Sequence, residues 1–120
     1  VNPLKPLATP RVYREFDRMK LGGDFSEHPA PAWNDRATAI THIASMSNAL
    51  TAPARSLLPD VGVIIEILRN AARVEYAAMS GSGATCFAIV ESLAAAEALA
   101  AEVRATHPDW WVIGTELGGA

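Results

Sequence analysis

The chain has 120 residues, of which 50% are hydrophobic and 19% are charged, and its formal net charge is −3 at pH 7. This balance is typical of one packed globular domain and argues against disorder. A slightly acidic chain without a basic cluster is not expected to bind nucleic acid, and no apolar run approaches the roughly 20 residues that span a membrane. The single cysteine excludes an internal disulfide and fits a reducing compartment, so we expect a cytoplasmic location.

The first half of the chain predicts four helices. Thr9 and Pro10 are typical of a helix start, because threonine can cap the first turn and proline loses no hydrogen bond there. We expect this helix over about residues 10–20, with Thr9 as its cap and Gly22-Gly23 as its end. The other helices are expected from Asn34 or Asp35 to about 48, from 51 to just before Pro59, and from 59 to 70.

The second half changes to the spacing of strands. Strands are expected over residues 74–79, 85–90 and 110–117. The first two are joined by a short turn, so we expect them to pair antiparallel. Ser92 is expected to cap an alanine-rich helix over residues 93–105. Helices that cover one side of a small, mostly antiparallel sheet make an α+β fold the expected architecture.

The most distinctive stretch is the turn between the first two strands, Ser80-Gly81-Ser82-Gly83-Ala84-Thr85. Its glycines allow backbone conformations that a Cβ forbids, and hydroxyls stand on both sides of the turn. Backbone N–H groups in such a turn can line up to hold phosphate oxygens. The alternative is a plain bend with a close backbone approach. The stretch fits neither the P-loop nor the dinucleotide fingerprint, so the residues alone leave both alternatives open.

Four segments of the chain carry a family resemblance. They are Val1-Asn2-Pro3 leading to Thr9-Pro10-Arg11-Val12, Asn48-Ala49-Leu50-Thr51-Ala52-Pro53-Ala54, Leu58-Pro59-Asp60-Val61-Gly62, and Met79-Ser80-Gly81-Ser82-Gly83-Ala84-Thr85-Cys86-Phe87-Ala88. In this order they are similar to the GHMP small-molecule kinases, and within these to the 4-diphosphocytidyl-2-C-methyl-D-erythritol kinases. The last segment resembles the third glycine-rich motif of the family. The second departs from the family's Asn-Asp-Leu-Glu pattern, because Ala49 and Thr51 replace both acidic residues.

The resemblance implies the C-terminal domain of such a kinase, with a ferredoxin-like sheet whose first strand is truncated to Val1–Pro3. It implies that the ATP-binding and catalytic domain belongs before Val1 and is the missing partner of this chain. The whole enzyme would use ATP and Mg²⁺ to phosphorylate the 2-hydroxyl of 4-diphosphocytidyl-2-C-methyl-D-erythritol in non-mevalonate isoprenoid synthesis, and this chain alone would bind neither cofactor. Residues 80–85 would support the phosphate cavity, and Thr9 would lie on the substrate side.

The remaining polar residues suggest no further chemistry. None is placed as a convincing general base, so we expect no catalytic residue here and no activity from this chain alone. His28, His42 and His107 lack the spacing of metal ligands, so no metal site is expected. Two other functions stay open: a free-standing ferredoxin-like ligand-binding domain, and a domain that only mediates assembly. Another GHMP member, such as a homoserine or mevalonate kinase, is also possible, and an exposed sheet edge would allow self-association.

Overall fold

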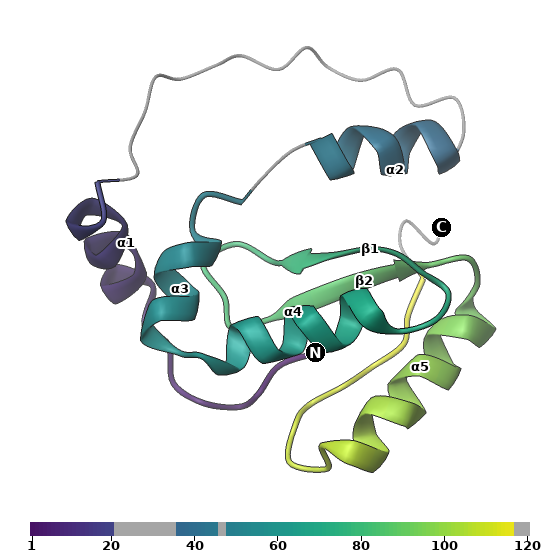
Figure 1. Cartoon of the computed structure of the whole chain (residues 1–120). Coiled ribbons are helices and arrows are strands. Elements are labelled where there is room, and N and C mark those ends of the chain that lie inside the picture. The colour runs from purple at the N-terminus through teal and green to yellow at the C-terminus, as the bar shows by residue number, and fades with distance from the viewer. Residues whose placement is uncertain (21–35, 46–47, 117–120) are drawn as a thin grey trace.

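The computed structural model describes residues 1–20, 36–45 and 48–116. Its elements are α1 (Thr9–Arg18), α2 (Arg36–Ser45), α3 (Thr51–Leu57), α4 (Asp60–Asn70), β1 (Val74–Met79), β2 (Cys86–Val90) and α5 (Leu93–Thr106). β1 and β2 pair antiparallel, α4 packs on both strands, and α5 contacts β2 (Figure 1). α1 and α3 pack together at the end of the hairpin where the strands are joined. The fold is therefore α+β, as expected.

The core lies between α4 and the hairpin. The face of α4 that the sequence predicted to be apolar is buried, and it consists of Val61, Ile64, Ile65 and Leu68. These side chains meet inward-facing residues of the strands, including Met79 and Cys86. Burying one such aliphatic side chain contributes about 1.5–3 kcal/mol, so this face is the main reason why the helix stays on the sheet. None of the helices in the described part of the chain is long and apolar enough to cross a membrane.

The helix starts agree with the sequence at α5 and differ at α1. Ser92 caps α5 as predicted, because its hydroxyl accepts a hydrogen bond of 3.1 Å from the N–H of Ala95. The prediction that Thr9 caps α1 is wrong. The extended residue before the helix is Ala8, no side chain caps it, and Thr9 is already helical. The expected end at Gly22-Gly23 and the expected cap at Asn34 or Asp35 lie outside the described residues.

The expected strand over residues 110–117 is also wrong as an extended element. Up to residue 116, only Trp111 forms a β-bridge, with Asn2, through two hydrogen bonds of 2.8 Å. The bridge is antiparallel, so Pro3 lies opposite Trp110, where Leu4 then turns the backbone away with a φ of 57°. In the other direction Val1 lies opposite Val112, so residues 113–116 have no partner in the N-terminal segment of this chain. Val1 pairs with Cys86 on its other side, so the first residues lie between β2 and the C-terminal segment, as the truncated first strand predicts.

Candidate phosphate-binding loop

The turn between β1 and β2, residues 80–85, is here called the glycine loop. Its shape is fixed by two of its own hydrogen bonds: the N–H of Ser80 donates to the carbonyl of Thr85 at 2.8 Å, and the N–H of Gly83 donates to the carbonyl of Ser80 at 3.0 Å. Gly81 and Gly83 have φ values of 56° and 84°, which a side chain rarely allows. Both glycines are therefore needed for the conformation.

Four of the six loop amides, those of Gly81, Ser82, Ala84 and Thr85, donate no hydrogen bond to a described residue. Among them Gly81 is exposed and Ser82 is partly exposed, whereas Ala84 is buried. Over the described residues, no acceptor lies within hydrogen-bonding distance of the N–H groups of Gly81 and Ser82. Ser80 is exposed, and the hydroxyl of Ser82 lies 3.0 Å from the hydroxyl of Thr9. The loop is thus a tight hairpin bend, as one of the two alternatives drawn from the sequence states. Its unused amides leave phosphate binding, the other alternative, as a prediction.

The remaining loop residues face the protein. Ala84 is buried, and the Oγ1 of Thr85 accepts a hydrogen bond of 3.0 Å from the side-chain amide of Asn2. Gly83 is packed so closely that a Cβ there would lie 2.9 Å from the sulfur of Met79 and 3.2 Å from a methyl of Leu7. Of the six loop residues expected to support a phosphate, Ser80 and Gly81 are exposed and Ser82 is partly exposed, whereas Gly83, Ala84 and Thr85 are in contact with the rest of the protein.

Asn48 holds the loop from outside, and sequence reasoning gave it no role. Its side-chain amide donates to the carbonyls of Met79, at 3.1 Å, and Gly81, at 2.8 Å. Its side-chain oxygen accepts from the N–H of Leu50 at 3.0 Å. An asparagine just before a short helix is a signal for such a local turn, but the contact with a loop more than 30 residues away is visible only in three dimensions.

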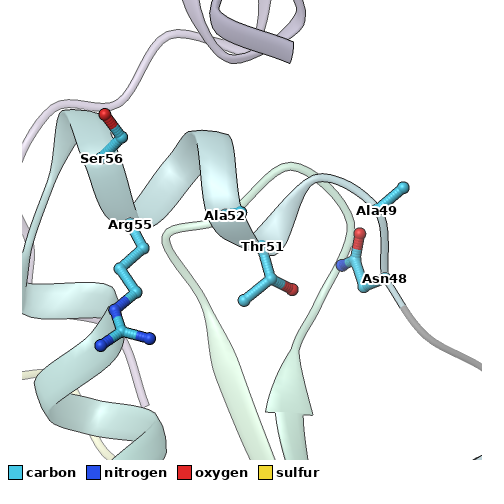
Figure 2. A pocket seen from close by; sticks show the side chains of 6 residues that line it. All are labelled: Asn48, Ala49, Thr51, Ala52, Arg55 and Ser56. Atoms are coloured by element: carbon cyan, nitrogen blue, oxygen red, sulfur yellow. The ribbon is translucent and has the colours of Figure 1, made fainter. Parts of the chain in front are cut away.

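Asn48 also lines an open depression beside the loop. The depression has a volume of about 690 Å³, and its lining comes from α3 and the segment before it, as Figure 2 shows: Asn48, Ala49, Thr51, Ala52, Arg55 and Ser56. The side chain of Arg55 extends from α3 toward α4, where its Nε lies over Gly62. Ala49 and Thr51 bring no acidic side chain to the depression, but the carboxylate of Glu15 accepts a hydrogen bond of 3.3 Å from the hydroxyl of Ser56. Glu66 lines a neighbouring depression together with Arg55.

No other chemistry is assembled in the described residues. Within ranges 1–20, 36–45 and 48–116, no group of three or more His, Cys, Asp or Glu side chains could hold a metal ion. His107 stacks on Trp110 with ring centroids 3.7 Å apart, and His28 lies outside the described residues. Cys86 is fully buried, and burial raises the pKa of its thiol to about 11, so it is no nucleophile at neutral pH.

Comparisons with known proteins place the chain in a family. The model of the family "GHMP kinases C terminal" matches residues 34–109, which is more than half of the chain. No solved structure matches the chain significantly.

Three relatives among curated proteins carry the same name. A 4-diphosphocytidyl-2-C-methyl-D-erythritol kinase from Rhodopseudomonas palustris (strain BisB18) is 48% identical over 98% of the chain, and one from Bradyrhizobium diazoefficiens is 41% identical over 93%. One from Hyphomonas neptunium is 37% identical over the whole chain. The chain spans about 40% of the length of these relatives. Because the family model covers most of the fold just described, the chain belongs to the GHMP kinase C-terminal family.

Proposed function

We propose that this chain is the C-terminal part of an ATP-dependent kinase that phosphorylates the 2-hydroxyl of 4-diphosphocytidyl-2-C-methyl-D-erythritol. Support for the substrate comes from the three relatives described above, which bear the name of that kinase and align along nearly the whole chain. The rest of the enzyme, including the domain that binds the body of ATP and supplies the catalytic groups, is proposed to lie outside this chain.

The observation that carries the proposal is the pair of free amides at Gly81 and Ser82. Phosphoryl transfer depends mainly on positioning the phosphates and stabilising their charge, with little covalent work by the protein. Two N–H groups with no acceptor among the described residues, next to the hydroxyls of Ser82 and Thr9, suit that task. Thr9 extends the site toward the alcohol substrate. None of these groups acts as a general base in this proposal.

Mg²⁺ is proposed to reach the site with the nucleotide. It would neutralise the charge on the phosphates, which is its usual contribution to phosphoryl transfer. The described residues offer no cluster of carboxylates for it, so its protein ligands would come from the other domain. A cytoplasmic location is proposed with this function, since its nucleotide substrates are cytoplasmic.

The test uses the full-length protein that contains this chain. ADP release is followed in a coupled assay with ATP, Mg²⁺ and one alcohol at a time: 4-diphosphocytidyl-2-C-methyl-D-erythritol, homoserine or mevalonate. We expect turnover with the first alcohol and none with the other two. Turnover with homoserine or mevalonate alone would move the chain to another member of the family.

The same assay on residues 1–120 alone tests whether the catalytic groups lie outside this chain. We expect no turnover, because no residue of this chain is proposed as a catalytic group. Turnover by the isolated chain would show that it carries its own catalytic residue. Absence of turnover in the full-length protein with any phosphate acceptor would favour the other reading, a ligand-binding or assembly domain.

A further inference from the structure

Asn48 donates hydrogen bonds to two carbonyl groups, one just before the glycine loop and one within it. Its amide nitrogen lies 2.8 Å from the carbonyl oxygen of Gly81 and 3.1 Å from that of Met79. One NH₂ group has two hydrogens, so it can satisfy both acceptors at once. The side-chain oxygen is used as well, because it accepts from the N–H of Leu50. The residue therefore connects the start of α3 with the loop.

The bond to Gly81 fixes the direction of the next amide. A peptide unit is planar, and in a trans unit the carbonyl of one residue and the N–H of the next point in opposite directions. The bond between Gly81 and Ser82 is trans. When Asn48 holds the carbonyl of Gly81, the N–H of Ser82 must therefore point away from Asn48. The described residues provide no acceptor for this N–H.

The loop itself does little to hold this peptide plane. Gly81 has a φ of 56°, and an added Cβ would meet nothing within 4 Å. A glycine in open space rotates at little cost in either sign of φ. The two internal hydrogen bonds of the loop involve Ser80, Gly83 and Thr85, and neither uses the Gly81–Ser82 peptide group. In the described part of the chain, the contact with Asn48 is therefore what restrains this peptide unit.

We infer that Asn48 is a positioning residue: it orients the Gly81–Ser82 peptide so that the N–H of Ser82 faces a phosphate oxygen. Asn48 itself touches no reacting atom in this inference. The inference rests on the proposed function for the identity of the phosphate, which is that of ATP. A group that is oriented before the phosphate arrives stabilises charge without having to reorganise during the reaction.

Two substitutions separate the possible effects of Asn48. Asn48→Ala removes both donors without adding a charge. Asn48→Asp also removes both donors, but it keeps an oxygen for the N–H of Leu50 and so preserves the turn into α3. An effect that both variants share can come neither from the new charge nor from a disturbed start of α3. Asn70→Ala, at the exposed end of α4, is the matched control.

The experiment uses the full-length protein with two readouts. The first is the ¹⁵N–¹H signal of Ser82 during titration with inorganic pyrophosphate. The second is kcat/KM for ATP, measured together with KM for the alcohol. In the unmodified protein we expect pyrophosphate to shift the Ser82 signal. Both Asn48 variants should lose that shift and lose on the order of tenfold in kcat/KM for ATP, while KM for the alcohol stays unchanged. Asn70→Ala should behave as the unmodified protein.

The outcomes distinguish this inference from the proposed function. Asn48 variants that keep the Ser82 shift and the kinetics overturn the inference and leave the kinase assignment intact. Turnover in the unmodified protein without a Ser82 shift overturns it as well. A Ser82 shift that disappears in both variants, in a protein without kinase activity, supports the inference and overturns the proposed function. If Asn48→Ala fails to fold, the comparison of Asn48→Asp with Asn70→Asp decides, since both add the same charge.

Discussion

The hydroxyl oxygens of Thr9 and Ser82 lie 3.0 Å apart, so the first residue of α1 contacts the glycine loop across 73 positions of the sequence. Thr9 was expected to cap its own helix, and the structure instead places its side chain against the loop. The contact connects the N-terminal segment with the turn of the hairpin. A threonine that capped its own helix would leave Ser82 without this partner.

The contact between Thr9 and Ser82 predicts a coupled effect on stability. Thr9→Val and Ser82→Ala should each lower the free energy of unfolding by about 0.5–1 kcal/mol, at the low end because the pair is exposed. The double variant should lose less than the sum, by about 0.5 kcal/mol, because the second substitution removes a partner already lost. Urea unfolding of the four proteins measures this coupling. Strictly additive losses would show that the two hydroxyls do not interact.

Two glycines are predicted to respond to alanine in opposite ways. Gly83→Ala should destabilise the protein by about 1–3 kcal/mol, because a methyl meets the sulfur of Met79 at 2.9 Å and the φ of 84° is unfavourable for alanine. Gly62→Ala, inside α4, should be neutral or stabilising by up to about 1 kcal/mol, since alanine favours helix and the close atom belongs to the flexible Arg55. Thermal unfolding of both variants checks the opposite signs.

Aspartate is predicted to replace Ser92 as the cap of α5, because it can accept the same hydrogen bond. Ser92→Ala should lower the free energy of unfolding by about 1 kcal/mol, because the N–H of Ala95 loses its acceptor. Ser92→Asp keeps an acceptor at that position and should retain most of the stability. Equal losses in the two variants, measured by urea unfolding, would mean that the hydrogen bond contributes nothing.

Cys86 is predicted to make stability depend on alkaline pH. Burial raises the pKa of its thiol from 9.0 to about 11, so the unfolded chain loses this proton at lower pH than the folded one. The free energy of unfolding should therefore be highest below pH 9 and fall as the pH rises from 9 toward 11. Cys86→Ala should remove this part of the slope.

A labelling experiment provides an independent check on Cys86. At pH 8, a thiol reagent should react with the folded protein only as fast as the protein opens, because the thiol is buried and protonated. The rate should rise to that of a free thiol in urea. Fast labelling of the folded protein would contradict the burial of this residue.

The sequence predicted the parts of the fold that depend on local patterns. The apolar face of α4, the two paired strands and the cap at Ser92 all follow from spacing and side-chain chemistry within one element. The strand expected over residues 110–117 did not form as an extended element, because strand pairing depends on which segment lies beside it. In the antiparallel register of the Asn2–Trp111 bridge, Val1 lies opposite Val112, so residues 113–116 find no partner in the N-terminal segment of this chain.

The candidate site was also predictable only in part, because some of its contacts join distant parts of the chain. Glycine and serine content identified the loop, since the conformation at Gly81 and Gly83 depends on those residues themselves. It could not show which amides the turn would use. Nor could it show that Asn48 or Asn2 would hydrogen-bond to the loop, because both contacts join distant parts of the chain. The phosphate role of the loop residues and self-association through an exposed sheet edge stay predictions.

Gly114 shows how closely the last described segment approaches α5. A Cβ at this position would lie 2.9 Å from the main-chain carbon of Ala96 and from the nitrogen of Glu97, and backbone cannot move aside as a side-chain tip can. In a saturation library, we therefore expect position 114 to accept glycine alone. Any other amino acid would separate the segment around Gly114 from α5. The buried indole of Trp110 would then become accessible to collisional quenchers.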